Sequence, residues 1–319
     1  NGVCEAAPST PAVLTVIPAT VGGNVSGGAT ICYGTDSPVL TLSGETGTII
    51  RWESVPAPAS NFTAVGAPIT SLANTSRTHL ALGLTESTCF RAVVQNAPCT
   101  PLASEPTCVT VLPAASPGSI SGPSPVCFGS NADLTLSGNL GDVVRWESST
   151  DVANQSSPQS IAHTQTTYTA INLQQSTCFR AYIRNGQDCP AIPSPWRCVL
   201  VDATSVGGSL GPDADVCADV STGVLTLTGQ VGVIEGWELS SDGGAFVDVG
   251  GAGATTLNYG PLPVGTHVWR VRVKSGICPA AYSSSATRRV YAPVTVASAG
   301  ADQVVCVSNA TLSGNAAVV

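Results

Sequence analysis

Cysteine is the residue type whose number and spacing in this chain point most clearly to chemistry. Twelve cysteines occur among 319 residues, a content typical of proteins that fold in an oxidising compartment. No two of them form a Cys-x-x-Cys pair, and the three histidines fall at unrelated places in the sequence. A zinc site is therefore not expected. The sequence predicts disulfides, with no metal and no other cofactor.

Ten of the cysteines return in sets about 90 residues apart, an interval that fits one small β-sandwich per set. The sets are Cys32, Cys89, Cys99 and Cys108; Cys127, Cys178, Cys189 and Cys198; and Cys217 with Cys278. Four cysteines in one set leave three connectivities open. In the third set, Val268 and Thr287 stand where the first has Cys89 and Cys108. Two cysteines that are absent together favour a bond between them in the other sets. The expected pairs are Cys89–Cys108, Cys178–Cys198, Cys32–Cys99, Cys127–Cys189 and Cys217–Cys278.

The remaining two cysteines lie near the ends of the sequence. Cys4 has the position of the second cysteine of a long-range pair, and Cys306 has the position of the first. We expect their partners to lie in neighbouring sequence of a longer chain. The alternative is a bond between Cys4 of one chain and Cys306 of the next, which would make a head-to-tail fibre.

The elements that must position the cysteines also repeat. Leu40-Thr41-Leu42-Ser43-Gly44 returns at residues 134–138 and, with Thr for Ser, at residues 225–229. Apolar and polar residues alternate in this segment, as in a strand with one buried face, and the glycine marks a turn. A tryptophan follows each copy. We expect these three side chains to anchor the cores: Trp52, Trp146 and Trp237.

About seven short strands fit into each interval, and no stretch has helical periodicity. The sequence therefore predicts an all-β fold of tandem immunoglobulin-like β-sandwich domains that form an elongated rod. The expected division is the end of a preceding repeat at 1–21, whole repeats at 22–116, 117–206 and 207–300, and the start of a following repeat at 301–319.

The repeated unit also resembles a known family. Leu40–Gly44, Arg51-Trp52-Glu53 and Phe90-Arg91-Ala92, with Cys32 and Cys99, resemble the Ig-like repeats of giant surface adhesins and filament proteins of gliding, type IX-secreting bacteria. Most such repeats look like spacers, so the resemblance implies a structural role at the cell surface.

The prominent charged residues are part of the repeat as well. An arginine follows an aromatic residue in each copy, and a glutamate follows each anchor tryptophan. These residues are Arg91, Arg180 and Arg270, with Glu53, Glu147 and Glu238. On neighbouring strands they would form cross-strand ion pairs, each worth less than about 1 kcal/mol if exposed. No nucleophile–base pair or carboxylate dyad stands outside this pattern, so the sequence does not predict an enzyme.

Composition narrows the function further. The net charge is −8 and the sequence has no basic stripe, so nucleic acid is not an expected partner. No apolar run reaches the length of a membrane span. We expect a structural segment of an extracellular or cell-surface stalk, adhesin or filament, whose partners are the neighbouring repeats of its own chain or further copies in a homopolymer. The alternative is a ligand- or glycan-binding array of a secreted protein. Trp196, alone in its loop, favours the structural hypothesis, because a binding array would keep exposed aromatics at equivalent loop positions.

Overall fold

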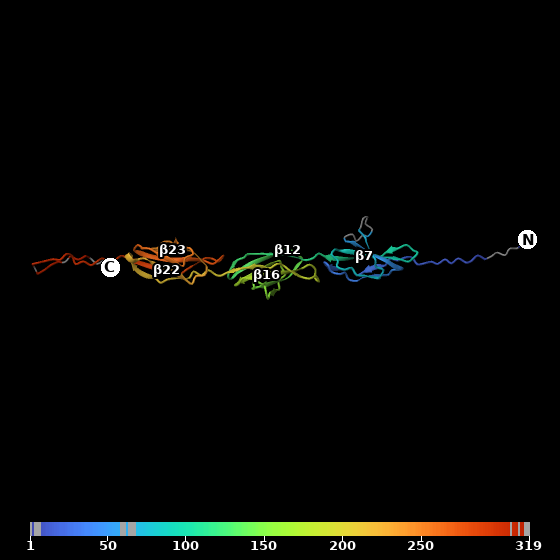
Figure 1. Ribbon diagram of the computed structural model, residues 1–319, viewed down its shortest axis with the longest axis horizontal. Helices are drawn as coiled ribbons and strands as arrows, with labels where there is room; N and C mark the ends of the chain where they lie inside the picture. Colours follow the sequence, from blue (N-terminus) through green and yellow to red (C-terminus); the bar gives the residue numbers. More distant parts are fainter. Residues whose placement is uncertain are drawn as a thin grey trace.

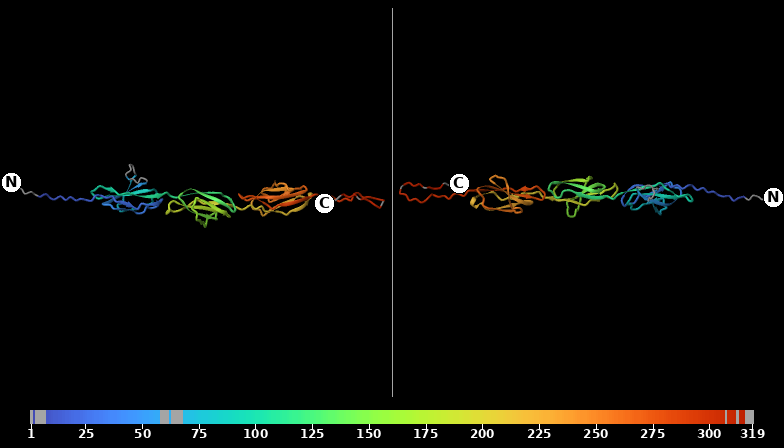
Figure 2. Two further views of the ribbon diagram at one scale, coloured as in Figure 1. Left: turned by 180° about the vertical axis from the view of Figure 1, so that it is seen from behind. Right: turned by 90° about the horizontal axis from the view of Figure 1, so that it is seen from above.

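Three β-sandwiches follow one another along the long axis of the molecule, so the chain is an elongated rod (Figures 1 and 2). The computed structural model describes residues 2, 8–57, 62, 68–306, 308–311 and 313–315. Within these residues the only helix is a single 3-10 turn, Ala218–Val220. The expected all-β fold of tandem Ig-like sandwiches is confirmed.

The first repeat packs a three-stranded sheet against a larger one. The small sheet has the order β1 (Asn24–Ser26), β3 (Leu40–Ser43), β6 (Thr78–His79). The larger has the order β2 (Thr30–Cys32), β9 (Thr107–Leu112), β7 (Thr88–Gln95), β4 (Thr48–Pro56), β5 (Thr70–Leu72), with β8 (Leu102–Ala103) also beside β7. Among the strand pairs described in this repeat, β2–β9 is parallel and the others are antiparallel.

The second repeat has the same arrangement. Its small sheet has the order β10 (Ser116–Ser121), β12 (Ser130–Leu140), β15 (Thr167–Leu173). The facing sheet has the order β14 (Gln159–Ile161), β13 (Asp142–Ser149), β16 (Thr177–Arg184), β17 (Ile192–Pro193), with β18 (Arg197–Val199) also on β16. A parallel pair, β11 (Val126–Cys127) with β19 (Val201–Asp202), corresponds to β2 and the end of β9.

The third repeat follows the same plan. Its small sheet has the order β20 (Ser209–Leu210), β22 (Gly223–Thr228), β25 (Thr256–Tyr259). The larger sheet has the order β21 (Ala214–Cys217), β28 (Ala286–Tyr291), β26 (Gly265–Lys274), β23 (Val233–Ser241), β24 (Val247–Gly250), with β27 (Ala281–Tyr282) also on β26. Again β21 runs parallel to the last strand, β28.

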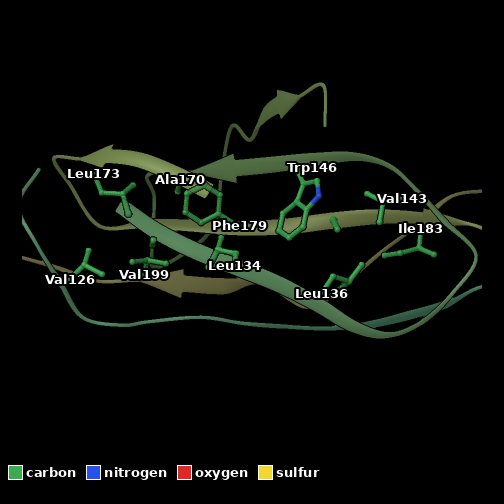
Figure 3. Packing of buried hydrophobic residues seen from close by; sticks show 12 residues of the cluster. Val126, Leu134, Leu136, Val143, Trp146, Ala170, Leu173, Phe179, Ile183 and Val199 are labelled. Carbon is green, nitrogen blue, oxygen red and sulfur yellow. The ribbon is translucent and has the colours of Figure 1, made fainter. Parts of the chain in front are cut away.

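The three tryptophans expected as core anchors lie inside the sandwiches. Trp52, Trp146 and Trp237 are each 0% exposed. Each indole N–H donates a 3.0 Å hydrogen bond to a backbone carbonyl oxygen, so burial leaves no polar atom of the ring without a partner. In the second repeat Trp146 lies between the sheets with Leu134, Leu136 and Phe179 (Figure 3).

A β-bulge in the tryptophan strand sets which side chains face the core. In β4 the register shifts between Ile49 and Arg51, and the same shift occurs in β13 and β23. Ile49 and Trp52 are three residues apart, so a regular strand would place them on opposite faces. The extra residue of the bulge lets both be buried, and Arg51 is left half-buried outside the core.

Candidate functional site: the repeat junctions and the outer sheet face

Two disulfides lie inside single repeats. Cys89 in β7 is directly opposite Cys108 in β9, with 3.9 Å between their Cα atoms. Cys178 in β16 faces Cys198 in β18 in the same way, at 3.8 Å. Both pairs are those expected from the cysteines missing in the third repeat, where Val268 faces Thr287 at the same register position.

The long-range disulfides join different repeats, which corrects the sequence-based pairing. Cys32 of the first repeat bonds to Cys189 of the second, with Cα atoms 5.5 Å apart. Cys127 of the second repeat bonds to Cys278 of the third, at 4.9 Å. The expected bonds Cys32–Cys99, Cys127–Cys189 and Cys217–Cys278 are therefore wrong. Each junction is held by the backbone and by a second covalent link.

The first cysteine of each junction bond lies at the end of its repeat where the chain leaves. Cys32 is level with Leu112, the last residue of β9. Cys127 is level with Asp202, the last residue of β19. Parallel pairing with the last strand brings these cysteines, which occur early in the sequence of each repeat, beside the exit to the next repeat.

The second cysteine of each bond lies in a turn at the entry end of its repeat. Cys189 follows β16, and its N–H donates to the carbonyl oxygen of Gly186. The neighbouring Asn185 donates from Nδ2 to the carbonyl oxygen of Pro113 in the linker, at 2.7 Å. At the next junction, the Sγ of Cys278 lies 3.3 Å from the carbonyl oxygen of Ala203 in the linker.

This geometry explains why the predicted pairing failed. Cys32 and Cys99 lie at opposite ends of one sandwich, because Cys32 is beside the exit strand and Cys99 is against the entering linker at Pro18. Cys99, Cys217 and Cys306 have no disulfide partner among the residues that the structure describes. Cys4, whose bond was left open between two alternatives, lies outside the described residues.

The predicted cross-strand ion pairs are present in all three repeats. Glu53, Glu147 and Glu238 face Arg91, Arg180 and Arg270 in the strand register. The shortest nitrogen–oxygen distances are 2.7, 2.6 and 2.7 Å, respectively. The condition of exposure does not hold, however: Glu53 is 5% and Glu147 8% exposed. The energy expected for an exposed pair therefore does not apply to the first two repeats.

A second arginine and an aromatic cover cause this burial. Arg51 and Arg145, on the same strands as the glutamates, contact Glu53 and Glu147 at 2.6 and 3.0 Å. The cross-strand arginines also stack against aromatic rings, Arg91 on Phe62 at 4.2 Å and Arg180 on Trp196 at 4.4 Å. The sequence contained one signal that was missed: Arg51 and Arg145 stand two residues before the glutamates, on the same side of the strand.

Trp196 therefore has a structural position. In the third repeat Arg270 lies between Phe246 and Tyr282, 3.9 Å from each ring centroid. The covering rings of the first and third repeats come from similar places, since Phe62 follows Glu53 and Phe246 follows Glu238 in the segment after the tryptophan strand. The second repeat takes its cover from a later loop, at Trp196, so a search for one loop aromatic shared by all three repeats could not find it.

The side-chain carboxyl groups of Glu53 and Glu147 are held in the charged form. Burial by itself would raise the pKa of Glu53, but the hydrogen bonds from Arg51 and Arg91 outweigh it and lower the pKa below the ordinary value. The pKa of Glu147 is lowered in the same way, with Arg180 and Arg145 outweighing its burial. This balance favours a structural ion network over an acid–base pair.

A cavity of about 450 Å³ opens on the first repeat. It is lined by residues that include Leu72, His79, Leu84 and Phe90. Burial lowers the pKa of His79, and its ring stacks on Trp52. Among the described residues of this repeat, the cavity is a candidate site for a small ligand.

Two further features limit the kinds of site. Among the described residues, no three His, Cys, Asp or Glu side chains are grouped so that they could hold a metal ion. The same part of the chain contains no helix of the length and apolarity that a membrane crossing needs.

Three sandwiches joined end to end by short linkers and disulfides define a tandem Ig-like repeat protein. A family model described as "Domain of unknown function (DUF8696)" matches residues 21–113, 116–203 and 206–292. The chain belongs to this family, with three copies of its domain in tandem.

Solved structures give the chain distant likenesses. Domains 3–5 of the extracellular part of Drosophila OTK share 13% identity at a TM-score of 0.34, over 88% of this chain and 100% of that one. Domains FN1–FN3 of chicken CNTN1 share 11% sequence identity at a TM-score of 0.30, over 85% of this chain and 98% of that one. Immunoglobulin domains 1–5 of Sidekick-1 share 12% sequence identity at a TM-score of 0.28, over 88% of this chain and 60% of that one. Likenesses at these scores carry no functional argument. No curated protein sequence matches the chain.

Proposed function

We propose that the chain is a stiff structural segment of an extracellular stalk, adhesin or filament, and not an enzyme. The observation that carries this proposal is the pair of disulfides that cross the junctions, Cys32–Cys189 and Cys127–Cys278. A junction held only by a short linker can bend about that linker. A second covalent link beside the linker removes much of this freedom.

Four disulfides in the described part of the chain support a location outside the reducing cytosol. The resemblance of the repeat to those of large surface proteins in gliding, type IX-secreting bacteria is the basis for assigning it to a bacterial cell surface. On this proposal its first partners are neighbouring repeats of the same kind.

Small-angle X-ray scattering tests the stiffness of the junctions. We expect the oxidised protein to scatter as one straight rod of fixed length. A variant with Cys32, Cys189, Cys127 and Cys278 all replaced by serine should have a smaller radius of gyration and a broader distance distribution. The matched control replaces Cys178 and Cys198, which removes a disulfide from within one repeat. We call the junction disulfides Cys32–Cys189 and Cys127–Cys278 the junction staples. Equal bending of the oxidised protein and the junction variant would overturn their structural role.

A ligand-binding array is the second candidate, and the cavity beside His79 favours it. Binding there would be detected by chemical-shift changes at His79 and Phe90 when surface glycans are titrated into the protein. Replacement of Leu84, in the cavity wall, by Trp should abolish such changes, and a titration with no change at these residues would reject this site.

A further inference from the structure

The cysteine that would begin a third junction bond is in place and unpaired. Cys217 is level with Tyr291, the last residue of β28, as Cys32 is with Leu112 and Cys127 with Asp202. It is exposed and has no disulfide partner among the described residues. Cys32 and Cys127, at this position in the first two repeats, bond to the next repeat. Cys217 therefore has the position of a junction cysteine.

The cysteine that would complete a bond at the other end is equally in place. The Sγ of Cys99 lies 3.7 Å from the carbonyl oxygen of Pro18 in the linker, as that of Cys278 lies 3.3 Å from Ala203. The N–H of Asn96 donates to the Oγ1 of Thr20 at 3.1 Å. The equivalent turn before Cys278 makes the same contact, from Ser275 to Ser205 at 2.8 Å.

The side-chain contact of the linker is repeated as well. Asn96 donates from Nδ2 to the carbonyl oxygen of Pro18 at 2.8 Å, as Asn185 does to Pro113 at 2.7 Å. At the first junction of the chain, this arrangement holds Cys189 within bonding distance of Cys32. Cys99 is therefore presented as Cys189 is, toward whatever repeat precedes the first.

We propose that Cys99 and Cys217 each take part in a further junction disulfide, of the same kind as Cys32–Cys189 and Cys127–Cys278. Cys217 bonds to the turn cysteine of a family repeat that follows the third sandwich. Cys99 bonds to the exit-strand cysteine of a repeat that precedes the first. The adjacent repeat is a domain of this family that presents one free thiol, located either in the same polypeptide or in a second copy of the chain.

The two cysteines cannot satisfy each other within one copy. Cys99 is at the entry end of the first sandwich and Cys217 at the exit end of the third, so the whole rod separates them (Figure 2). The bond must reach a neighbour. This requirement follows from the junction geometry and holds whether the array is a spacer or binds a ligand.

The reaction is a thiol–disulfide exchange with a disulfide oxidant, of the small-molecule or protein kind. The thiolate of one cysteine attacks the oxidant and forms a mixed disulfide, with release of one thiol. The thiolate of the adjacent repeat then displaces the second thiol. Two cysteine thiols lose two protons and two electrons, and the oxidant is reduced to two thiols.

A mixing experiment tests the bond between copies. Two variants of the full chain, Cys99→Ser and Cys217→Ser, are both made in a background with Cys4→Ser and Cys306→Ser. They are incubated separately and together in a buffer of reduced and oxidised glutathione. We expect the mixture to form a covalent dimer on a non-reducing gel, with a Cys99–Cys217 peptide in the digest, and each variant alone to stay monomeric. Dimers formed as readily by a single variant would overturn the specific pairing.

A lengthened chain tests the bond within one polypeptide. Residues 18–116 are joined directly after Tyr291, so that Pro18 follows the last strand as Pro113 follows Leu112. Cys4, the original Cys99 and the appended copy of Cys32 are replaced by serine. Titration with a maleimide should then find no free thiol, and the Cys217→Ser control should show one.

The two experiments together separate the sources. A mixed dimer shows that a second copy can supply the adjacent repeat, whereas a closed staple in the lengthened chain without mixed dimers assigns it to the same polypeptide. Two free thiols in the lengthened chain together with no mixed dimer would overturn the proposal. Neither result depends on whether the junction staples stiffen the rod, so a failure here is distinct from a failure of the proposed function.

Discussion

The second and third repeats share a fold but differ in the bonds that hold it. The second has a disulfide inside the sheet, Cys178–Cys198, whereas the third has Val268 facing Thr287 at that position. The third repeat nevertheless has cysteine at both junction positions, Cys217 and Cys278, and Cys278 bonds to the second repeat. Ordinary side chains stand where the second repeat has its internal disulfide, whereas both junction positions hold cysteine.

Packing offers a reason for the difference. The third repeat buries a second tryptophan, Trp269, at 1% exposure where the second repeat has the smaller Phe179. The extra apolar surface adds to the hydrophobic stabilisation of the sandwich. No side chain inside one sandwich can replace a link to the next one. The disulfide within a sandwich therefore stabilises one repeat, whereas a junction disulfide links two repeats. Removal of each kind should have different consequences.

The largest effect should come from a junction bond. While the second repeat is folded, Cys189 stays beside Pro113, so the bond to Cys32 closes a loop of about 80 residues in the first repeat. On the chain-entropy model such a loop stabilises by about 4 kcal/mol. The same bond closes a comparable loop in the second repeat. We expect Cys32→Ser with Cys189→Ser to lower the melting temperatures of both repeats in calorimetry.

Cys306→Ser is the matched control for this prediction, because Cys306 is exposed and has no disulfide partner in the described part of the chain. It should leave all three transitions unchanged. If the double variant melts like this control, the junction bond does not couple the stabilities of neighbouring repeats.

Truncation of an anchor tryptophan should affect one repeat only. Trp146→Ala removes a fully buried ring and should cost about 3–5 kcal/mol, close to the whole stability of a small domain. Ile171→Ala, at a position 72% exposed in the same repeat, is the control. Urea denaturation followed by far-ultraviolet circular dichroism would measure both, and equal midpoints would contradict the anchor assignment.

Conversion of the second repeat to the pattern of the third should have a somewhat smaller effect. Cys178→Val with Cys198→Thr copies the pair Val268 and Thr287 without the larger tryptophan. The chain-entropy model gives a loss of about 3 kcal/mol for a loop of this size. The urea midpoint of the second repeat should fall, and that of the third should stay the same. No change in the second repeat would show that its bond, too, is dispensable.

The smallest effect concerns the glutamates. Glu147 contacts two arginines, whereas the third repeat has Gly236 in place of the second one, and Glu238 pairs with Arg270 alone among the described residues. We expect Glu147→Gln to cost about 1–3 kcal/mol and Glu238→Gln to cost less, measured by urea denaturation at pH 7. An equal loss of unfolding free energy in both repeats would show that Arg145 adds nothing to the stability of the ion network.

The pH dependence has a defined sign. The pKa of Glu147 is lower in the folded repeat than in the unfolded chain. Its ion network therefore stabilises fully above the unfolded carboxyl pKa of about 4.5, and this contribution is lost as the pH falls through the folded pKa. The second repeat should lose stability in acid, and Glu147→Gln should flatten this dependence.

The sequence was sufficient for the strands and the core. Alternation in Leu40-Thr41-Leu42 and the recurring tryptophan predicted the sandwich, because side-chain period and burial are local properties of a strand. The positions of Glu53 and Arg91 on neighbouring strands followed from the same pattern. The burial of their pair did not, because the covering ring of Phe62 belongs to a different part of the chain.

The disulfides show what a repeat cannot reveal. A shift of one whole repeat leaves every spacing unchanged, so Cys32 matches Cys189 as well as it matches Cys99. The distinction lies in topology: a strand parallel to the last strand ends at the exit, and the turn after β7 lies at the entry. An Ig-like topology applied to the cysteine positions is enough to place Cys32 and Cys99 at opposite ends of one sandwich, and that step was missing from the sequence-based pairing.

The junction staples also limit how far the rod can be pulled out. Along the backbone, Cys32 and Cys278 are separated by about 250 residues, which would extend to about 850 Å if all were unfolded. With both staples closed, tension passes from Cys32 to Cys189, back along the chain to Cys127, and on to Cys278. That route contains about 60 residues and reaches about 210 Å at full stretch. Under tension, the distance between Cys32 and Cys278 can therefore grow only to about 210 Å, even if the middle sandwich unfolds completely.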